Sequence, residues 1–101
     1  MNNYQYKDLT VEVIDEPTYT FGSSENYFNY SKHYFGDGGI EYPTSKHGIK
    51  IYQGDQIIES CIAIGSGGAT EVHQNSSLID KDQLLLCCCD TIFVWLFQTL
   101  L

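Results

Sequence analysis

The sequence predicts a mainly β fold, in which antiparallel hairpins form an incomplete propeller-like or sandwich-like sheet. Aromatic residues that favour strands are abundant, with eight tyrosines and five phenylalanines among 101 residues. Apolar and polar residues alternate, or form short apolar runs between turn residues, and no window of a dozen residues before position 78 has helical spacing. A chain of this length is expected to form a single domain, residues 1–101.

The first predicted strand covers residues 8–15, where Leu9, Val11 and Val13 share one face and polar residues occupy the other. Pro17 ends this strand, and residues 18–21 are expected to begin another. Residues 22–45 are aromatic, polar and glycine-rich, so we expect a short strand pair or an ordered loop, with a turn over residues 36–39.

The aromatic residues of this part favour core and cross-strand packing over a ligand or carbohydrate platform, because packing needs no further assumption. They are Tyr27, Phe28, Tyr30, Tyr34, Phe35 and Tyr42.

A hairpin is predicted around residues 53–56, where a short Gly-Asp turn separates two runs rich in isoleucine. On its second strand, alternation places Ile58 with Ser60, Ile62 and Ile64, opposite a face that includes Cys61 and Ala63. Both faces become apolar toward the end of this strand, which is typical of a central strand.

The last part of the chain predicts another hairpin, with a turn at Lys81-Asp82, an apolar strand over residues 83–89, a turn at Asp90-Thr91 and a strand over residues 92–97. With Asp90 in the turn and Trp95 near the end, this run resembles the inner hairpin of a β-propeller blade of the WD-repeat or quinoprotein-like type. Up to about Phe93 the chain also resembles uncharacterised small bacterial β-rich proteins. These resemblances imply a fold and no activity.

Residues 94–101 form an atypical apolar tail without charge or turn signals, which suggests a truncated or frameshifted chain. An alternative is a C-terminal membrane anchor over Leu84–Leu101, eighteen residues with Asp90 as their one charge. A carboxylate at mid-span costs about 2.5–3.5 kcal/mol on insertion scales. Strand alternation is therefore the favoured interpretation of this segment.

The acidic net charge of the chain disfavours two classes of partner, nucleic acids and anionic membranes. Five lysines and no arginine stand against thirteen acidic residues, for a formal net charge of −8. Nucleic acids and anionic membranes are therefore not expected partners, since binding to either depends on cationic side chains. A protein partner, or a second copy, is expected to bind through a sheet edge by strand addition. Three of the four cysteines are consecutive and no secretory signal begins the chain, which favours the cytoplasm.

A glycine-rich loop over residues 65–70 supplies the candidate cofactor-binding residues, Gly65, Gly67 and Gly68. A dinucleotide-binding turn needs glycine or alanine at its sixth position and a helix after it. Thr70 occupies that position and the following residues do not continue as a helix, so an inter-strand loop is favoured and no cofactor is expected.

The candidate metal ligands are Cys61, His73, Cys87 and Cys89. Their spacing is not the paired spacing of zinc sites, so small apolar filling of a crowded strand is the favoured interpretation of the thiols. No catalytic residue is assigned. Three functional hypotheses follow: a non-catalytic protein-interaction or structural domain, a ligand- or nucleotide-binding domain that uses the glycine-rich loop, and a tail-anchored membrane protein.

Overall fold

The computed structural model describes residues 2–20, 23–26, 28–36, 40–41, 43–66, 77–88 and 91–97. These residues form eight β-strands and no α-helix. In chain order the strands are β1 (Asn2–Tyr6), β2 (Leu9–Asp15), β3 (Lys32–Phe35), β4 (Ser45–Gln53), β5 (Gln56–Gly65), β6 (Ser77–Asp80), β7 (Gln83–Cys88) and β8 (Thr91–Leu96).

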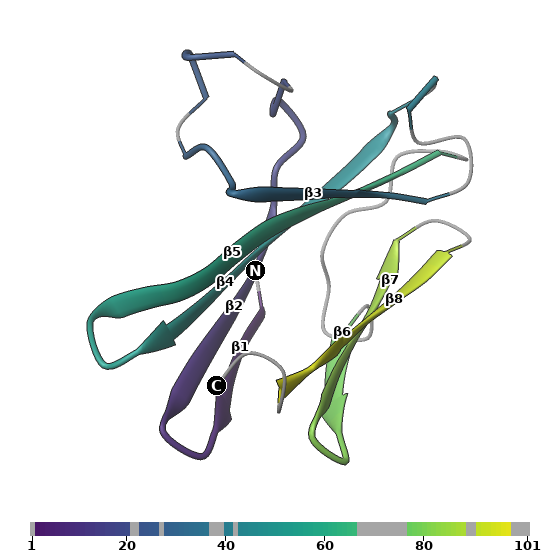
Figure 1. Ribbon diagram of the computed structural model, residues 1–101. Coiled ribbons are helices and arrows are strands. Elements are labelled where there is room, and N and C mark those ends of the chain that lie inside the picture. Colours follow the sequence, from purple (N-terminus) through teal and green to yellow (C-terminus); the bar gives the residue numbers. More distant parts are fainter. Residues whose placement is uncertain are drawn as a thin grey trace.

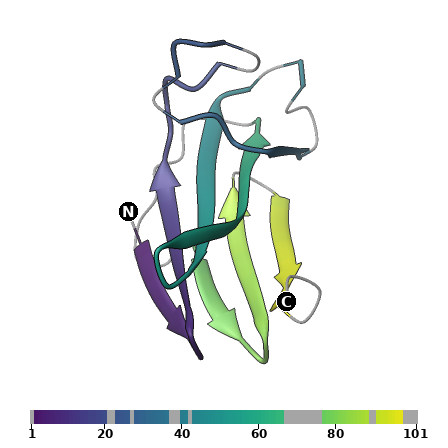
Figure 2. The same ribbon diagram turned by 60° about the vertical axis from the view of Figure 1, so that its left-hand side comes forward.

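Two sheets pack face to face (Figures 1 and 2). The five-stranded sheet has the order β1-β2-β4-β5-β3, and the three-stranded sheet has the order β6-β7-β8. All neighbouring strands are antiparallel except β3, which pairs parallel with β5. The predicted mainly β fold with antiparallel hairpins is confirmed, and its architecture is sandwich-like. The propeller resemblance stays a prediction.

Left-handed backbone conformations mark the turns of three hairpins. Lys81 and Asp82, between β6 and β7, have φ angles of 49° and 65°, and Gly54, between β4 and β5, has a φ of 62°. Both turns were predicted from the sequence. Positive φ in a two-residue turn matches the right-handed twist of the strands that it joins. A third hairpin, in which Lys7 has a φ of 54° between β1 and β2, was not predicted.

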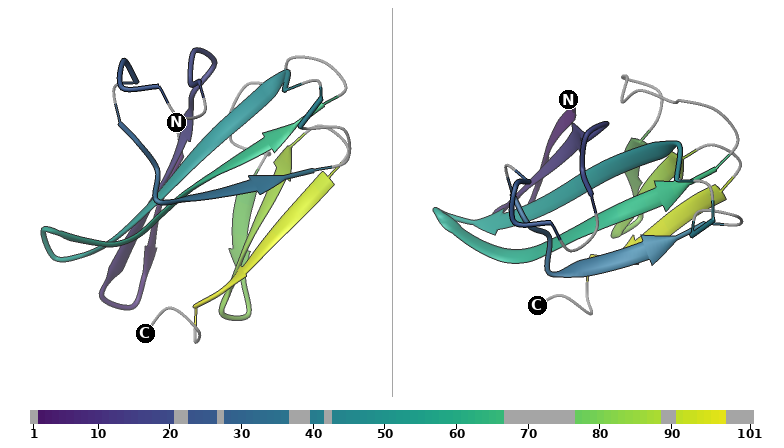
Figure 3. Two further views of the ribbon diagram at one scale, coloured as in Figure 1. Left: turned by 45° about the horizontal axis from the view of Figure 1, so that its top comes forward. Right: turned by 90° about the horizontal axis from the view of Figure 1, so that it is seen from above.

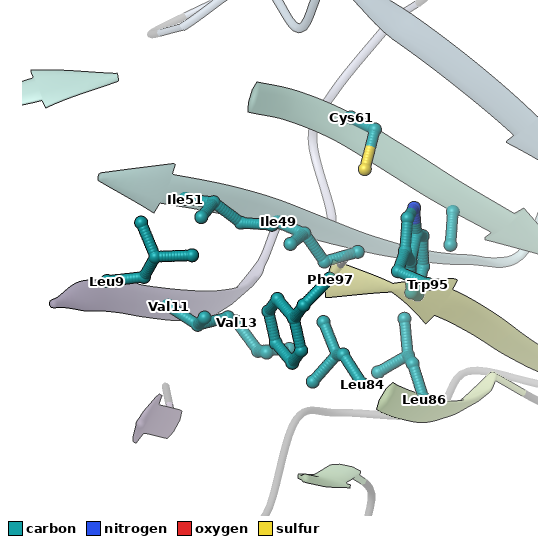
Figure 4. Packing of buried hydrophobic residues seen from close by; sticks show 11 residues of the cluster. Leu9, Val11, Val13, Ile49, Ile51, Cys61, Leu84, Leu86, Trp95 and Phe97 are labelled. Carbon is teal, nitrogen blue, oxygen red and sulfur yellow. The ribbon is translucent and has the colours of Figure 1, made fainter. Parts of the chain in front are cut away.

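The main core lies between the two sheets (Figure 4). It is built from alternate residues of each strand, because successive side chains of a strand point to opposite faces. The buried members are Leu9, Val11, Val13, Ile49, Ile51, Cys61, Ala63, Leu84, Leu86, Trp95 and Phe97.

The predicted alternation of side chains along β5 is wrong at Ile58. Ile58 packs against the main core, on the side of Cys61, and does not share a face with Ile62 and Ile64. The reason is a β-bulge between Ile51 and Tyr52, which shifts the register of β4 against β5. A bulge adds one residue to a strand and so reverses the alternation beyond it.

A second, smaller core covers the outer face of the five-stranded sheet. Tyr19 and Tyr30, from the segment between β2 and β3, pack on Ile62 and Ile64 with Phe28 beside them. The strand expected to begin at residue 18 is not present: residues 18–20 form a turn and an irregular stretch, and Phe21 lies outside the described residues. After Pro17 the Tyr19 amide donates to the Glu16 carbonyl at 3.2 Å, which turns the chain across the sheet.

The packing interpretation of the aromatic residues is correct for Phe28 and Tyr30, which lie in this smaller core. Tyr34 and Phe35 instead lie on β3, a short edge strand, and are 38% and 39% exposed. Tyr27 and Tyr42 are outside the described residues.

The last described segment, residues 91–97, belongs to the sandwich. Residues 84–88 and 91–96 are strands, so they do not form the continuous helix that a membrane anchor over Leu84–Leu101 would need. Within the described part of the chain, no helix has the length and apolar character needed to span a bilayer. Trp95 and Phe97 are buried in the main core, which places the beginning of the apolar tail inside the fold; residues 98–101 are outside the described residues.

Candidate functional site

One lateral side of the sandwich is closed. There β1 of the larger sheet meets β6 and the turn after it, and Tyr6 stacks on Phe97 with ring centroids 4.3 Å apart. The Tyr6 hydroxyl donates a hydrogen bond to the Asp82 carboxylate, which raises the pKa of Tyr6. This contact joins the two sheets through side chains of residues far apart in the sequence.

The opposite lateral side is more open, and there the edge strands β3 and β8 face each other (Figure 3). The Tyr34 and Trp95 rings meet edge to face, with centroids 6.0 Å apart. Beside them lies a hollow of about 540 Å³. Its lining residues are Lys32, Tyr34, Ile58, Glu59, Val94, Trp95 and Leu96.

An ion pair forms one wall of this hollow. Lys32 Nζ lies 2.8 Å from Glu59 Oε2, and the hydrogen bond to Glu59 raises the pKa of Lys32. The Lys32 side chain is 54% exposed, whereas that of Glu59 is 9% exposed. A pair whose lysine is largely in solvent contributes little to stability, since solvent screens the attraction. The two opposite charges do neutralise each other in this wall of the hollow.

The most distinctive feature of the open side is β8 itself. Among the described strands, β8 is paired only with β7. The Phe97 amide donates to the Asp82 carbonyl at 3.0 Å, so the ladder places Phe97 in a hydrogen-bonded pair. Because such pairs alternate in an antiparallel ladder, Phe93 and Trp95 also direct their main-chain groups to β7. The main-chain groups of Ile92 and Val94 therefore point outward, along the open edge.

The side chains of β8 divide by the same alternation. Phe93, Trp95 and Phe97 face the core, and Ile92, Val94 and Leu96 face solvent. The exposed fractions are 67% for Ile92, 50% for Val94 and 42% for Leu96. β8 is thus an edge strand that is apolar on both faces.

Natural edge strands are usually protected by a lysine, a proline, a bulge or an inward-pointing charge. None of these is found in the described ladder of β8, where residues 91–96 carry no charge and pair in unbroken register with β7. Such an edge is a template for one more strand. We take the outer edge of β8, with Ile92, Val94 and Leu96, as the candidate functional site and call it the β8 edge.

The glycine-rich loop is described only at its start. Gly65 ends β5, where it pairs with Ser45, and its carbonyl accepts the Thr44 amide at 3.0 Å. This is sheet pairing, and the described residues contain no helix that begins after β5. Gly67 and Gly68 lie outside the described residues.

The candidate metal ligands are not brought together in the part of the chain that the structure describes. Cys61 is fully buried in the main core, and burial raises the pKa of its thiol to about 12. Cys87 lies on β7, its side chain is not described, and His73 and Cys89 are outside the described residues. Across the described ranges, no group of three or more His, Cys, Asp or Glu side chains has the arrangement of a metal site.

The β8 edge was not singled out as a site by sequence reasoning, although a signal for it exists. In residues 92–97 both alternating faces are apolar, whereas a half-buried strand has one polar face. A second apolar face on a strand at the end of a sheet indicates that something else covers it. The Lys32–Glu59 pair had no comparable signal, because it depends on the parallel pairing of β3 with β5.

Comparisons with protein-family models, with curated proteins and with solved structures find no match to this chain.

Proposed function

We propose that this chain is a protein-interaction domain that adds one more strand along the β8 edge, and that the added strand is β8 of a second copy. The single observation that carries the proposal is an unprotected edge strand with three exposed apolar side chains. Strand addition uses main-chain hydrogen bonds for affinity and side-chain contacts for selectivity.

Self-pairing suits the residues of β8. In an antiparallel pair about a two-fold axis at Val94, that residue lies opposite its own copy, and Ile92 lies opposite Leu96 of the partner. Every cross-strand contact on the exposed face is then aliphatic, and such pairs stabilise a sheet by about 0.2–1 kcal/mol each. The three-stranded sheet would become a continuous six-stranded one.

Charge does not oppose this arrangement at the contact. Each chain carries a formal charge of −8, but residues 91–96 contribute none of it. The neighbouring Lys32 and Glu59 neutralise each other. At physiological ionic strength charges more than about 8 Å apart are largely screened, so the remaining acidic residues weaken the pair without preventing it.

The test is the oligomeric state of the purified chain, measured by sedimentation velocity over a concentration series. We expect a dimer whose population grows with concentration, and Val94→Lys should make the chain monomeric, because it places like charges directly opposite each other. Ile57→Lys is the matched control, since Ile57 is 39% exposed but lies in the other sheet, where it pairs with Tyr52 in the β4–β5 hairpin. This control should dimerise as the wild type does.

Two results contradict the proposal. A wild-type chain that stays monomeric up to about 0.1 mM excludes a second copy as a partner of useful affinity. A dimer that survives Val94→Lys excludes the β8 edge as the surface. A photo-crosslinking residue at position 94 identifies the occupant directly: a crosslink to the same chain supports the proposal, and a crosslink to a different polypeptide overturns the second copy as the occupant.

The other expectations from the sequence stay predictions. They are a cytoplasmic location, a partner that is a protein and not a nucleic acid, and the resemblance of the C-terminal hairpin to a β-propeller blade.

A further inference from the structure

A second hollow, of about 520 Å³, lies on the outer face of the five-stranded sheet and shares no lining residue with the hollow beside the β8 edge. Its floor consists of three paired residues on adjacent strands: Lys46 of β4 pairs with Ile64 of β5, and Ile64 pairs with Phe35 of β3. Tyr19 and Thr20 form one wall, and Ile40 and Pro43 form the other. Its size falls within the range of small-molecule sites.

The Tyr19 wall of this hollow, which we call the outer pocket, is held in place by three contacts. The Tyr19 hydroxyl lies 2.7 Å from His33 Nε2, and the ring packs edge to face on Tyr30 at 5.6 Å. The Tyr19 carbonyl accepts a hydrogen bond from Lys46 Nζ at 2.6 Å. A wall formed before the ligand arrives lowers the entropy that binding costs.

Lys46 gives the outer pocket its chemical character. Among the described lining residues its ammonium is the only charged group, and the others are aromatic or aliphatic apart from Thr20. One of its three N–H donors goes to the Tyr19 carbonyl, and within the described residues no carboxylate lies within ion-pair distance of it. Lys46 Nζ therefore has two further donors, and its side chain lines a mainly apolar hollow.

We propose that the outer pocket binds a small carboxylic acid with an aromatic or branched aliphatic body. The body would lie between Tyr19, Phe35 and Ile64, and the carboxylate would accept hydrogen bonds from Lys46. Charge-assisted bonds of this type are about twice as strong as neutral ones, and an apolar surround strengthens them further. This inference is independent of strand addition, because the two surfaces share no lining residue.

The experiment uses three probes that differ only in the head group: 4-phenylbutyrate, 4-phenylbutan-1-ol and 4-phenylbutylamine. Binding is followed by amide shifts in ¹H–¹⁵N spectra, which should change at Thr20, Phe35 and Ile64. We expect the carboxylate to bind roughly tenfold more tightly than the alcohol, the effect of one charge-assisted hydrogen bond, and the amine to bind most weakly.

Lys46→Met should remove the preference for the carboxylate and leave the affinity for the alcohol unchanged, whereas Lys46→Arg should keep the preference. Lys50→Met is the matched control. Lys50 lies on the same face of β4, but its ammonium sits 3.8 Å from the Phe28 ring centroid, outside the outer pocket. Removal of that charge should not change the order of the three probes.

The proposal is overturned if no probe shifts the spectrum at about 5 mM, if the amine binds as well as the carboxylate, or if Lys46→Met keeps the preference. Should Lys46→Met fail to fold, Ile40→Asp provides the same test. Ile40 is 71% exposed at the rim of the outer pocket. An aspartate there should weaken the binding of the carboxylate probe and strengthen the binding of the amine probe. An unchanged order of the three affinities would refute the proposal.

Discussion

Gly48→Ala tests whether the segment over the outer face is packed as the structure has it. A Cβ at Gly48 would lie 2.0 Å from the Tyr30 hydroxyl oxygen and 2.3 Å from Cζ of the same ring. An ordinary contact needs at least 3.4 Å, so the hydroxyl must retreat by about 1.4 Å. Tyr30 is 4% exposed and packs against Phe28 and Tyr19, which leaves little room for this movement.

The expected cost has two parts. Overpacking of a well-packed core costs about 1–3 kcal/mol. The Tyr30 hydroxyl also donates to Glu16 Oε2 at 2.5 Å, and the loss of a bond to a charged group costs about 1.5–3 kcal/mol. A small shift of the ring can keep part of its packing and part of the hydrogen bond. We therefore expect Gly48→Ala to lower the free energy of unfolding by about 2–4 kcal/mol. That is a large share of the stability of a small domain.

The assay is urea unfolding, followed by the fluorescence of Trp95, the single tryptophan, which is buried. The same substitution is repeated in a Tyr30→Ala background. Without the ring, alanine in a strand should be more favourable than glycine by about 0.5–1 kcal/mol. The double-mutant cycle should therefore show a coupling energy of at least about 2 kcal/mol.

Gly54→Ala is the control, because it separates backbone strain from crowding. Gly54 has a φ of 62° and no heavy atom within 4 Å of an added Cβ. Its substitution should cost about 1–2 kcal/mol through the left-handed backbone alone, whether or not Tyr30 is present. If Gly48→Ala is neutral, or costs the same in both backgrounds, Tyr30 does not lie over Gly48 and the account of the smaller core is wrong.

Alkaline pH should destabilise the fold, because a carboxylate hydrogen bond raises the pKa of Tyr52 to about 12 and burial raises that of Tyr30. The unfolded chain loses these protons near pH 10, so stability that is complete below pH 10 is lost as pH rises toward 12. Urea midpoints that stay constant between pH 9 and 11, or a pH dependence that Tyr52→Phe does not reduce, contradict this. Phe97→Ala should cost about 3–5 kcal/mol, since the ring is fully buried and stacks on Tyr6. A shift of the urea midpoint worth less than about 1 kcal/mol would mean that Phe97 is outside the core.

Sequence reasoning succeeded where the determinants are local. The turns at Gly54 and at Lys81-Asp82 were found because turn residues lay between two apolar runs. β2 was found because its alternation is strict, and β7 and β8 were found because their apolar runs are bounded by turns. In each case a hairpin joins neighbours along the chain, so the signal and the partner lie within a few residues.

Sequence reasoning failed where the formation of a strand depends on residues far away in the sequence. In the polar stretch of β1, the described residues that pack on the main core are Tyr4 and Tyr6, and this contact buries them partly. The sequence left β3 open as a strand or a loop, because β3 pairs parallel with β5 and no hairpin turn joins the two strands. The candidate ligand residues were chosen by type alone, and type does not predict that Cys61 would be buried among aliphatic side chains.

What the sequence determined by itself is the β class, the position of two hairpins and the apolar character of residues 91–97. These follow from side-chain alternation and turn chemistry, which act over a few residues. The tertiary structure alone decided that β8 is an edge strand and that Lys46 lies in a hollow beside Tyr19. Both depend on which strands become neighbours, and that order is selected by burial of the whole apolar surface at once.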